Sequence, residues 1–190
     1  MDKVRVKLDN ISEIVGIGDL GLLVLVDTDR KRQVVIPCDK YMMYFIGLRL
    51  DSKADTSRLL PEALCRLFDV ANERLEVIIS SIVDGEYRAM VVNQDTLSTV
   101  SVRASDGVLL AVACRVPLFF EARLMLSQSV PYRKDSMAMP LPVNVVSDEM
   151  LQSALDRAVS DENYELASRL RDELKRRRQQ PQTPEHHEGD

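Results

Sequence analysis

Residues 101–120 constrain the fold of this chain more than any other part of its sequence. They read as a strand, a sharp helix start, an apolar helix over residues 105–114 and a further strand after Pro117. Such an order, repeated in outline earlier in the chain, predicts a domain that mixes a sheet with helices.

Three polar residues stand where that strand meets the helix, namely Arg103, Ser105 and Asp106. Ser105 or Asp106 is expected to cap the free N–H groups of the first helical turn. Arg103 and the remaining polar group then lie at a helix N-terminus, a place where anions bind readily. The alternative is structural, with a cap and an ion pair that only stabilise the junction.

The first 131 residues fall into two similar halves, each predicted as three strands followed by two helical segments. Ile36-Pro-Cys-Asp39 and Arg103-Ala-Ser-Asp106 occupy equivalent junctions, which suggests an internal duplication with a period of about 67 residues. The expected strands are residues 4–8, 22–26, 33–36, 75–83, 87–92 and 100–102, and the expected helical segments are 41–50, 61–68, 105–114 and one after Pro117.

Composition favours a globular protein with one good core and a small appendage, because the chain has 190 residues and is 45% hydrophobic. No apolar run approaches the roughly 20 residues that cross a bilayer, and the N-terminus does not read as a signal peptide. Cys38, Cys65 and Cys114 are expected to be buried small hydrophobes in a reducing cytoplasm.

The charge balance argues against a strongly basic nucleic-acid binder. The net charge is −5, and residues 1–146 carry 18 Lys and Arg against 19 Asp and Glu. Affinity for phosphates comes from clustered Lys and Arg, so any nucleic-acid site has to be a local patch.

The last third of the chain changes character. Residues 132–146 read as a linker, 147–178 as a helical hairpin, and 179–190 as a disordered tail. Leu151, Ala154, Leu155 and Ala158 share one face of the first helix, and the second helix carries Tyr164, Ala167, Leu170 and Leu174. The basic run at residues 175–178 is interpreted as a solvated helix end.

Two patterns carry little chemistry. Gly16-Ile-Gly-Asp-Leu-Gly21 matches a dinucleotide-binding pattern, but a strand follows it where a helix is needed, so it is interpreted as a hairpin turn. The two histidines, His186 and His187, lie in the polar tail, which excludes a Ser–His or Cys–His nucleophile from the folded domain.

The stretch from Arg103 through Leu118 resembles the signature of the bifunctional nuclease domain family, an Arg-Pro-Ser-Asp-Ala-Ile-Ala-Leu-Ala-like run before a Pro-Ile strand. The resemblance implies an α+β domain with a duplicated three-strand-plus-helices unit, a mixed sheet and outer helices. It also implies hydrolysis of DNA or RNA phosphodiesters with Mg²⁺ or Mn²⁺. Arg103 and Asp106 are the catalytic candidates, Asp106 the metal candidate, and Ser105 and Arg58 phosphate contacts.

The chain departs from that family at two positions. Where the family has Ile-Gly-x-x-Glu-Ala this chain has Ile36-Pro-Cys-Asp-Lys40-Tyr41, and the family's Arg-Pro-x-Thr-His region appears as Arg58-Leu-Leu-Pro-Glu62. A Glu is thus replaced by Lys40 and a His by Glu62, while Arg58 is kept. Metal-assisted hydrolysis normally needs converging carboxylates, and Asp39, Asp84 and Glu86 are the other candidates.

The C-terminal hairpin resembles the UVR motif of excinuclease subunits B and C. The resemblance lies in Tyr164-Glu-x-Ala167 and Leu170-Arg-Asp-Glu-Leu174. It implies protein–protein contact, and a hairpin of this length buries little alone, so its apolar seam is expected to meet a partner or a second copy. Leu155, Tyr164, Ala167 and Leu170 are the predicted partner-binding residues.

Our leading hypothesis is a bacterial-type cytoplasmic nuclease, homo-oligomeric and without a membrane segment. The alternative is a non-catalytic adaptor that binds a partner through the hairpin. The near-neutral main domain, the absent histidine and the substituted glutamate favour this alternative.

Overall fold

The computed structural model describes residues 2–13, 20–67, 74–83, 85–132 and 148–179. By its internal contacts the chain divides into two compact units, Met1–Val145 and Val146–Asp190. The predicted linker and tail, the glycine-rich turn and both histidines lie almost entirely outside the described residues.

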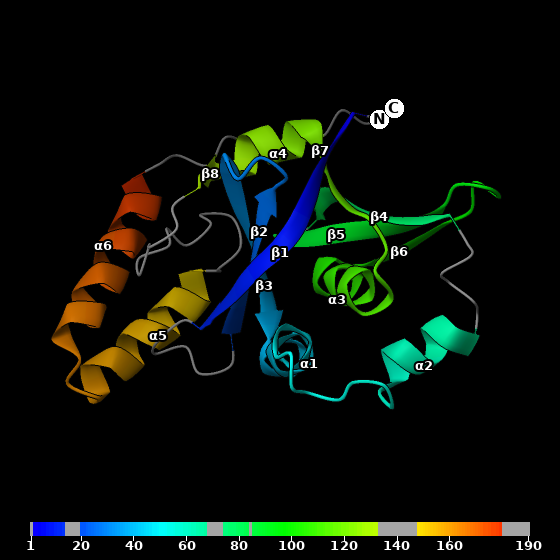
Figure 1. Cartoon of the computed structure of the whole chain (residues 1–190). Helices are drawn as coiled ribbons and strands as arrows, with labels where there is room; N and C mark the ends of the chain where they lie inside the picture. The colour runs from blue at the N-terminus through cyan, green and yellow to red at the C-terminus, as the bar shows by residue number, and fades with distance from the viewer. Residues whose placement is uncertain (1, 14–19, 68–73, 84, 133–147, 180–190) are drawn as a thin grey trace. The chain divides into compact units, whose positions relative to one another are not determined.

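A single eight-stranded sheet runs through the first unit, in the order β6-β5-β4-β7-β1-β2-β3-β8 (Figure 1). Two antiparallel three-strand meanders flank β7, which pairs parallel with β4 and antiparallel with β1. Parallel pairing needs a crossover connection, and α3 supplies it between β6 and β7. The strands are β1 Lys3–Glu13, β2 Leu20–Asp27, β3 Arg32–Asp39, β4 Leu75–Val83, β5 Glu86–Asn93, β6 Thr99–Arg103, β7 Leu118–Glu121 and β8 Val130–Pro131.

The described residues of this unit form four helices: α1 Lys40–Leu50, α2 Leu60–Leu67, α3 Ala104–Cys114 and α4 Ala122–Gln128. Helices α1 and α3 contact each other, with α1 against β2 and β3 and α3 against β4 and β5 (Figure 1). Close approach of α3 requires Gly107, because a Cβ there would lie 2.9 Å from Val77 Cγ1 and 3.0 Å from Ala89 Cβ.

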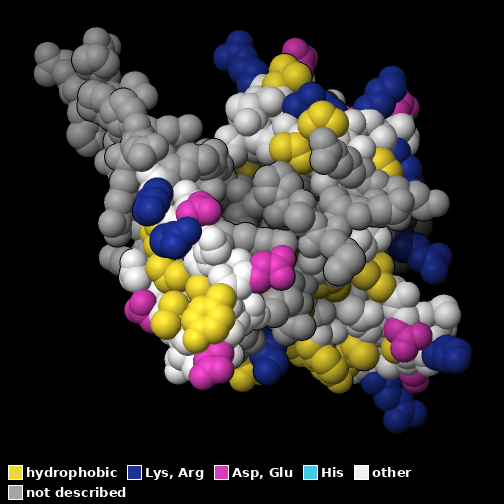
Figure 2. Space-filling model, turned by 90° about the vertical axis from the view of Figure 1, so that its left-hand side faces the viewer, with side chains coloured by type: hydrophobic (Ala, Val, Ile, Leu, Met, Phe, Trp, Pro, Cys, Tyr) yellow, Lys and Arg dark blue, Asp and Glu magenta, His cyan; other side chains and the backbone are white. Residues whose placement is uncertain are grey.

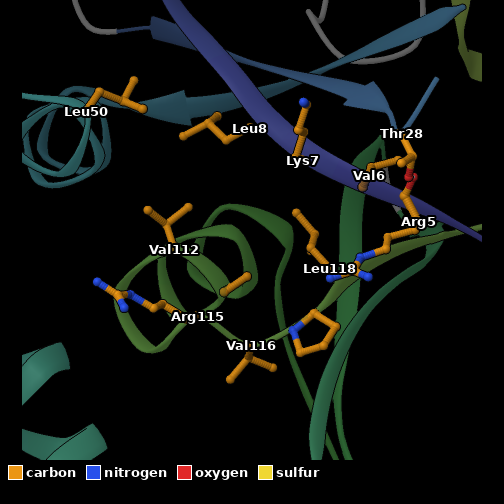
Figure 3. Close-up of a pocket in the computed structure, with 12 residues that line it drawn as sticks. Arg5, Val6, Lys7, Leu8, Thr28, Leu50, Val112, Arg115, Val116 and Leu118 are labelled. Atoms are coloured by element: carbon orange, nitrogen blue, oxygen red, sulfur yellow. The ribbon is translucent and has the colours of Figure 1, made fainter. Parts of the chain in front are cut away.

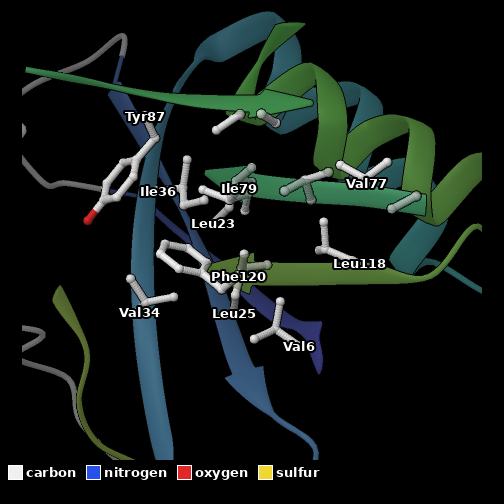
Figure 4. Close-up of a cluster of buried hydrophobic side chains, with 14 of the residues drawn as sticks. Val6, Leu23, Leu25, Val34, Ile36, Val77, Ile79, Tyr87, Leu118 and Phe120 are labelled. Atoms are coloured by element: carbon white, nitrogen blue, oxygen red, sulfur yellow. The ribbon is translucent and has the colours of Figure 1, made fainter. Parts of the chain in front are cut away.

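The core fills the space between the sheet and these helices. Inward-facing side chains of both meanders meet around β7, where Phe120 is fully buried and lies edge-on to Tyr87 (Figure 4). Alternate residues along each strand supply this face, as the pleat requires. The central members are Val6, Leu23, Leu25, Val34, Ile36, Val77, Ile79 and Leu118.

The predicted α+β class with a mixed sheet and outer helices is confirmed. The strand predicted after Pro117 is confirmed as β7. It stands between α3 and α4, so the second half is not simply three strands followed by two helical segments. The sequence pattern also puts one apolar face on the helix at residues 41–50, and this expectation is wrong in part. The residues expected on that face are Tyr41, Met42, Phe45, Ile46 and Leu50. Met42 and Ile46 are buried, but Tyr41 and Leu50 are exposed.

The cysteine prediction is wrong for two of the three residues. Cys65 in α2 and Cys114 at the end of α3 form a disulfide, with their Cα atoms 5.8 Å apart. Both are half-buried, whereas Cys38 is a buried free thiol as predicted. The bond joins α2 to α3, the helix that α2 contacts.

In the second unit, the described residues 148–179 form two helices, α5 Asp148–Ser160 and α6 Tyr164–Gln179, which contact each other. The turn between them places Glu162 in the left-handed region with φ 56°. Buried side chains come from both helices: Leu151, Ala158, Ala167, Leu170 and Leu174. Across the ranges described above, no helix is long and apolar enough to cross a membrane.

Candidate functional site

Two strand-to-helix junctions meet at Arg103. Its guanidinium donates from Nε to Asp106 Oδ2 at 2.7 Å and from Nη2 to Asp106 Oδ1 at 3.2 Å. Its Nη1 lies 3.4 Å from Asp39 Oδ2, on a residue 64 positions earlier in the chain. The cation therefore joins the β6–α3 junction to the β3–α1 junction.

Asp39 is placed by its own helix. As the N-cap of α1 it has an extended backbone, and its Oδ1 accepts a hydrogen bond from the Met42 amide at 2.8 Å. An aspartate at this position satisfies one of the unpaired amides of the first turn. This leaves Oδ2 directed to Arg103.

The start of α3 differs from the sequence prediction. The N-cap is Arg103, which makes no side-chain capping bond, so neither Ser105 nor Asp106 caps the helix. Both lie inside the first turn, with Ser105 buried and Asp106 accepting from Arg103. A carboxylate there is stabilised by the positive end of the helix dipole, which explains its position without a cap.

The three charged side chains are accessible. Exposed fractions are 55% for Arg103, 45% for Asp39 and 38% for Asp106. The hydrogen bond and charge of Asp106, with a smaller contribution from Asp39, hold the pKa of Arg103 above its ordinary value. The guanidinium is thus a permanent cation that solvent, or a ligand, can reach.

Other predicted residues do not join this cluster. Arg58 is exposed in the turn before α2, and within the described ranges no hydrogen bond or ion pair connects it to Arg103, Asp39 or Asp106. Glu86 forms an ion pair with Arg88 at 3.1 Å. Asp84 lies outside the described residues.

The two family departures have different structural outcomes. Glu62 forms an ion pair with Arg49 at 2.5 Å, and both side chains are largely buried, at 15% and 4% exposure. Glu62 therefore holds α2 against the end of α1. Lys40 is exposed as the first residue of α1, directly after Asp39.

The carboxylates do not form an obvious cation site. Among the described residues no group of three or more His, Cys, Asp or Glu side chains could hold a metal ion. In the cluster itself, Asp106 uses both oxygens on Arg103, and Asp39 uses one on the Met42 amide and one on Arg103. The place that an ion would take between the two carboxylates is occupied by a guanidinium.

A separate pocket of about 460 Å³ lies at the other end of α3. Its apolar wall comes from β1, α3 and β7, and Arg5 and Arg115 stand beside it (Figure 3). None of the residues predicted to bind or act on a substrate lines this pocket. The wall includes Val6, Leu8, Val112, Val116 and Leu118.

Sequence reasoning named Asp39 but could not show that it approaches Asp106. The equivalence of the two junctions was the sequence signal that could have predicted this approach, because equivalent ends of a duplicated unit can meet in one sheet. It missed Arg88, which lies directly opposite Arg103 in the β5–β6 pairing. It also missed the exposure of two tyrosines on α1, at 79% for Tyr41 and 63% for Tyr44.

In the hairpin, the four residues predicted to bind a partner differ in exposure. Tyr164 is 69% exposed and Leu155 is half-buried. Ala167 and Leu170 are buried. Tyr164 is consequently the most exposed of the four predicted residues.

Comparison with protein families gives two matches. A model of the bifunctional nuclease domain matches residues 23–133, which is 111 of the 190 residues and includes the Arg103, Asp39 and Asp106 cluster. A model of the UvrB/uvrC motif matches residues 149–180, the hairpin. No curated protein matches the chain.

Proposed function

Because the chain belongs to the bifunctional nuclease domain family, we propose that its sheet unit hydrolyses phosphodiester bonds of DNA or RNA. The observation that carries this proposal is the exposed Arg103 cation at the N-terminus of α3, flanked by two carboxylates. Guanidinium groups bind phosphate bidentately, and helix N-termini favour anions.

Each residue of the cluster has a distinct role in the proposed reaction. Arg103 binds a phosphate oxygen of the substrate and stabilises the negative charge that grows on it in the transition state. Asp106 orients a water molecule and accepts its proton as the oxygen attacks phosphorus. The bond from phosphorus to the leaving oxygen breaks, and that oxygen takes a proton from solvent, giving a phosphomonoester and an alcohol.

Asp39 acts as a positioning residue in this scheme. Its carboxylate holds Arg103 from the α1 side while capping α1. A guanidinium has five N–H donors, and Arg103 uses three of them on the two carboxylates, so two remain for a phosphate oxygen.

Mg²⁺ or Mn²⁺ is the cofactor that the family resemblance implies. The donor set of the cluster does not fit a resident ion, because all four carboxylate oxygens are hydrogen-bonded and Arg103 lies between them. The cleavage assay therefore compares the rate with Mg²⁺, with Mn²⁺ and without free metal.

The experiment measures cleavage of labelled single- and double-stranded DNA and RNA by purified protein, with Mg²⁺, with Mn²⁺ and with EDTA. Arg103→Ala and Asp106→Asn are expected to lose at least about 100-fold in rate, the usual size of an electrostatic or acid–base contribution. Arg74→Ala and Asp95→Asn are matched controls, because these residues form an exposed ion pair elsewhere on the sheet. Equal rates in all four variants would refute the assigned roles.

A second candidate function is that of an adaptor that binds a partner protein, or a second copy of the chain, through the hairpin. Tyr164, 69% exposed within the match to the UvrB/uvrC motif, supports this candidate. Deleting residues 147–190 and, separately, changing Tyr164 to Ala discriminate between the two. An adaptor loses association, measured by light scattering, whereas a nuclease keeps its intrinsic rate.

We propose the cytoplasm as the place of action, in agreement with the sequence prediction. The Cys65–Cys114 disulfide is unusual there, since cytosolic disulfides are mostly transient or redox-sensing. Trapping free thiols in cell lysates, followed by mass spectrometry, measures the fraction oxidised. A fully oxidised pair in all conditions contradicts a cytoplasmic location.

A further inference from the structure

Two aromatic side chains stand in solvent on α1, the helix that Asp39 caps. Tyr41 and Tyr44, on α1, have exposed fractions of 79% and 63%. Large aromatic side chains normally bury most of their surface, so a pair of exposed rings on one helix is informative. The opposite side of α1 is anchored, because Met42 and Ile46 are buried in the core.

The two rings lie on the same side of α1. Residues three positions apart are neighbours on a helix surface. The Tyr44 ring also contacts Phe45 edge-to-face, with centroids 5.7 Å apart, which restricts its orientation. A rigid helix therefore presents two neighbouring aromatic faces to solvent.

Asp39 connects the helix that carries these rings to the charged cluster. Asp39 caps α1 and bonds Arg103, and Tyr41 follows it by two residues. Tyr44 is five residues from Asp39, a rise of roughly 7.5 Å along the helix. Exposed Lys40 stands between Asp39 and Tyr41, so this end of the helix carries one lysine beside the two rings, and Asp39 links it to the Arg103 guanidinium.

Two exposed rings beside a lysine and an accessible guanidinium match the chemistry of one class of ligand. Unpaired bases of a single strand stack on aromatic side chains, while Lys and Arg hold the backbone phosphates. Bases inside a duplex are already stacked on each other and offer no free face to a protein ring. The carboxylates of Asp39 and Asp106 balance the charges of Lys40 and Arg103, so a site here has to draw its affinity from base stacking more than from charge.

We propose that Tyr41 and Tyr44 are a stacking platform for bases of single-stranded DNA or RNA whose phosphates are bound by Lys40 and Arg103. The inference rests on the proposed nuclease function and assigns its substrate class. A single strand crosses from the platform to the cluster, which brings a phosphodiester bond to Arg103 and Asp106.

Binding is measured by fluorescence anisotropy of the full-length protein with three labelled probes. One is a 12-nucleotide single strand of thymidine, one is an abasic phosphodiester chain of the same length, and one is the paired duplex. A gel confirms that each probe stays intact. The variants are Tyr41→Leu and Tyr44→Leu, with Tyr41→Phe and Tyr44→Phe as matched controls that keep the aromatic face.

Each leucine variant is expected to bind the thymidine strand roughly 5- to 140-fold more weakly, the range that corresponds to one base–aromatic stack. Each phenylalanine variant is expected to bind like the wild type. The abasic chain is expected to bind all five proteins equally and more weakly than the thymidine strand binds the wild type. Melting curves check folding, and exposed sites should leave them unchanged.

The outcomes separate this inference from the function on which it rests. If the wild type binds or cleaves nucleic acid and the leucine variants bind the thymidine strand equally well, the platform is refuted and the nuclease proposal stands. Equal affinity for the abasic and thymidine probes, or tighter binding of the duplex, also overturns it. If the wild type neither binds nor cleaves any probe, both fail, and the exposed rings become a protein-docking surface.

Discussion

Truncating Glu62 is expected to destabilise the protein strongly, although the residue lies in a surface helix. Arg49 is 4% exposed, and its guanidinium has Glu62 Oε2 at 2.5 Å and the Phe45 carbonyl as acceptors. Its Nε atom is buried without any partner. Glu62→Ala leaves this buried cation with one neutral acceptor.

The magnitude follows from the burial of the pair. Two unit charges about 4 Å apart interact by about 4 kcal/mol at an effective dielectric constant near 20. Removing one partner of a buried pair typically costs ~3–5 kcal/mol, because the other charge stays desolvated. We expect Glu62→Ala to lower the free energy of unfolding by about 3 kcal/mol, or the melting temperature by roughly 6–12 °C for a chain of this size.

The assay is urea unfolding followed by circular dichroism, with the Cys65–Cys114 disulfide intact in every sample because it also holds α2. The double variant Arg49→Met/Glu62→Leu is expected to recover most of the loss, since an apolar pair needs no solvation. Asp95→Ala, which breaks an exposed ion pair, is the control and should change stability by less than about 1 kcal/mol. A loss below 1 kcal/mol for Glu62→Ala, or no recovery in the double variant, would refute the reasoning.

Three further predictions concern packing, the disulfide and alkaline pH. Gly107→Val should destabilise by about 1–3 kcal/mol in urea unfolding, because even a Cβ at this position lies within 3.0 Å of side chains of β4 and β5. Unchanged stability would contradict the close approach of α3. Reducing the Cys65–Cys114 bond, which closes a loop with a sequence separation of 49, should cost up to about 4 kcal/mol of chain entropy. A Cys65→Ser variant that unfolds like the oxidised wild type would disprove this. Burial raises the pKa of Cys38 from 9.0 to about 12 and that of Tyr87 from 10.0 to about 12. The unfolded chain therefore loses these protons first, and stability should fall as pH rises from about 9 to about 12. Cys38→Ala/Tyr87→Phe should flatten that decline, and an equally steep decline would exclude these groups as its cause.

The sequence by itself determined the local elements and the type of fold. Residues 75–83 were predicted as a strand and are β4, and the predicted helix over residues 105–114 differs from α3 by one residue. These patterns are reliable because a strand or helix that buries one face must repeat its apolar residues at the period of its own backbone. Motifs within one stretch of chain, such as the match to the UvrB/uvrC hairpin, are readable for the same reason.

Tertiary structure alone decided which of those elements meet. Asp39 and Arg103 are 64 residues apart, and Cys65 and Cys114 are 49 apart. Neither pairing can be predicted from the sequence near its residues, because each depends on how strands and helices far apart in the chain are arranged. The place of β7 between β4 and β1 in the sheet, and the exposure of Tyr41, were likewise decided by the tertiary structure. Periodicity marks a residue as apolar or aromatic, but only the neighbours of its helix decide whether that residue is buried or left to bind a ligand.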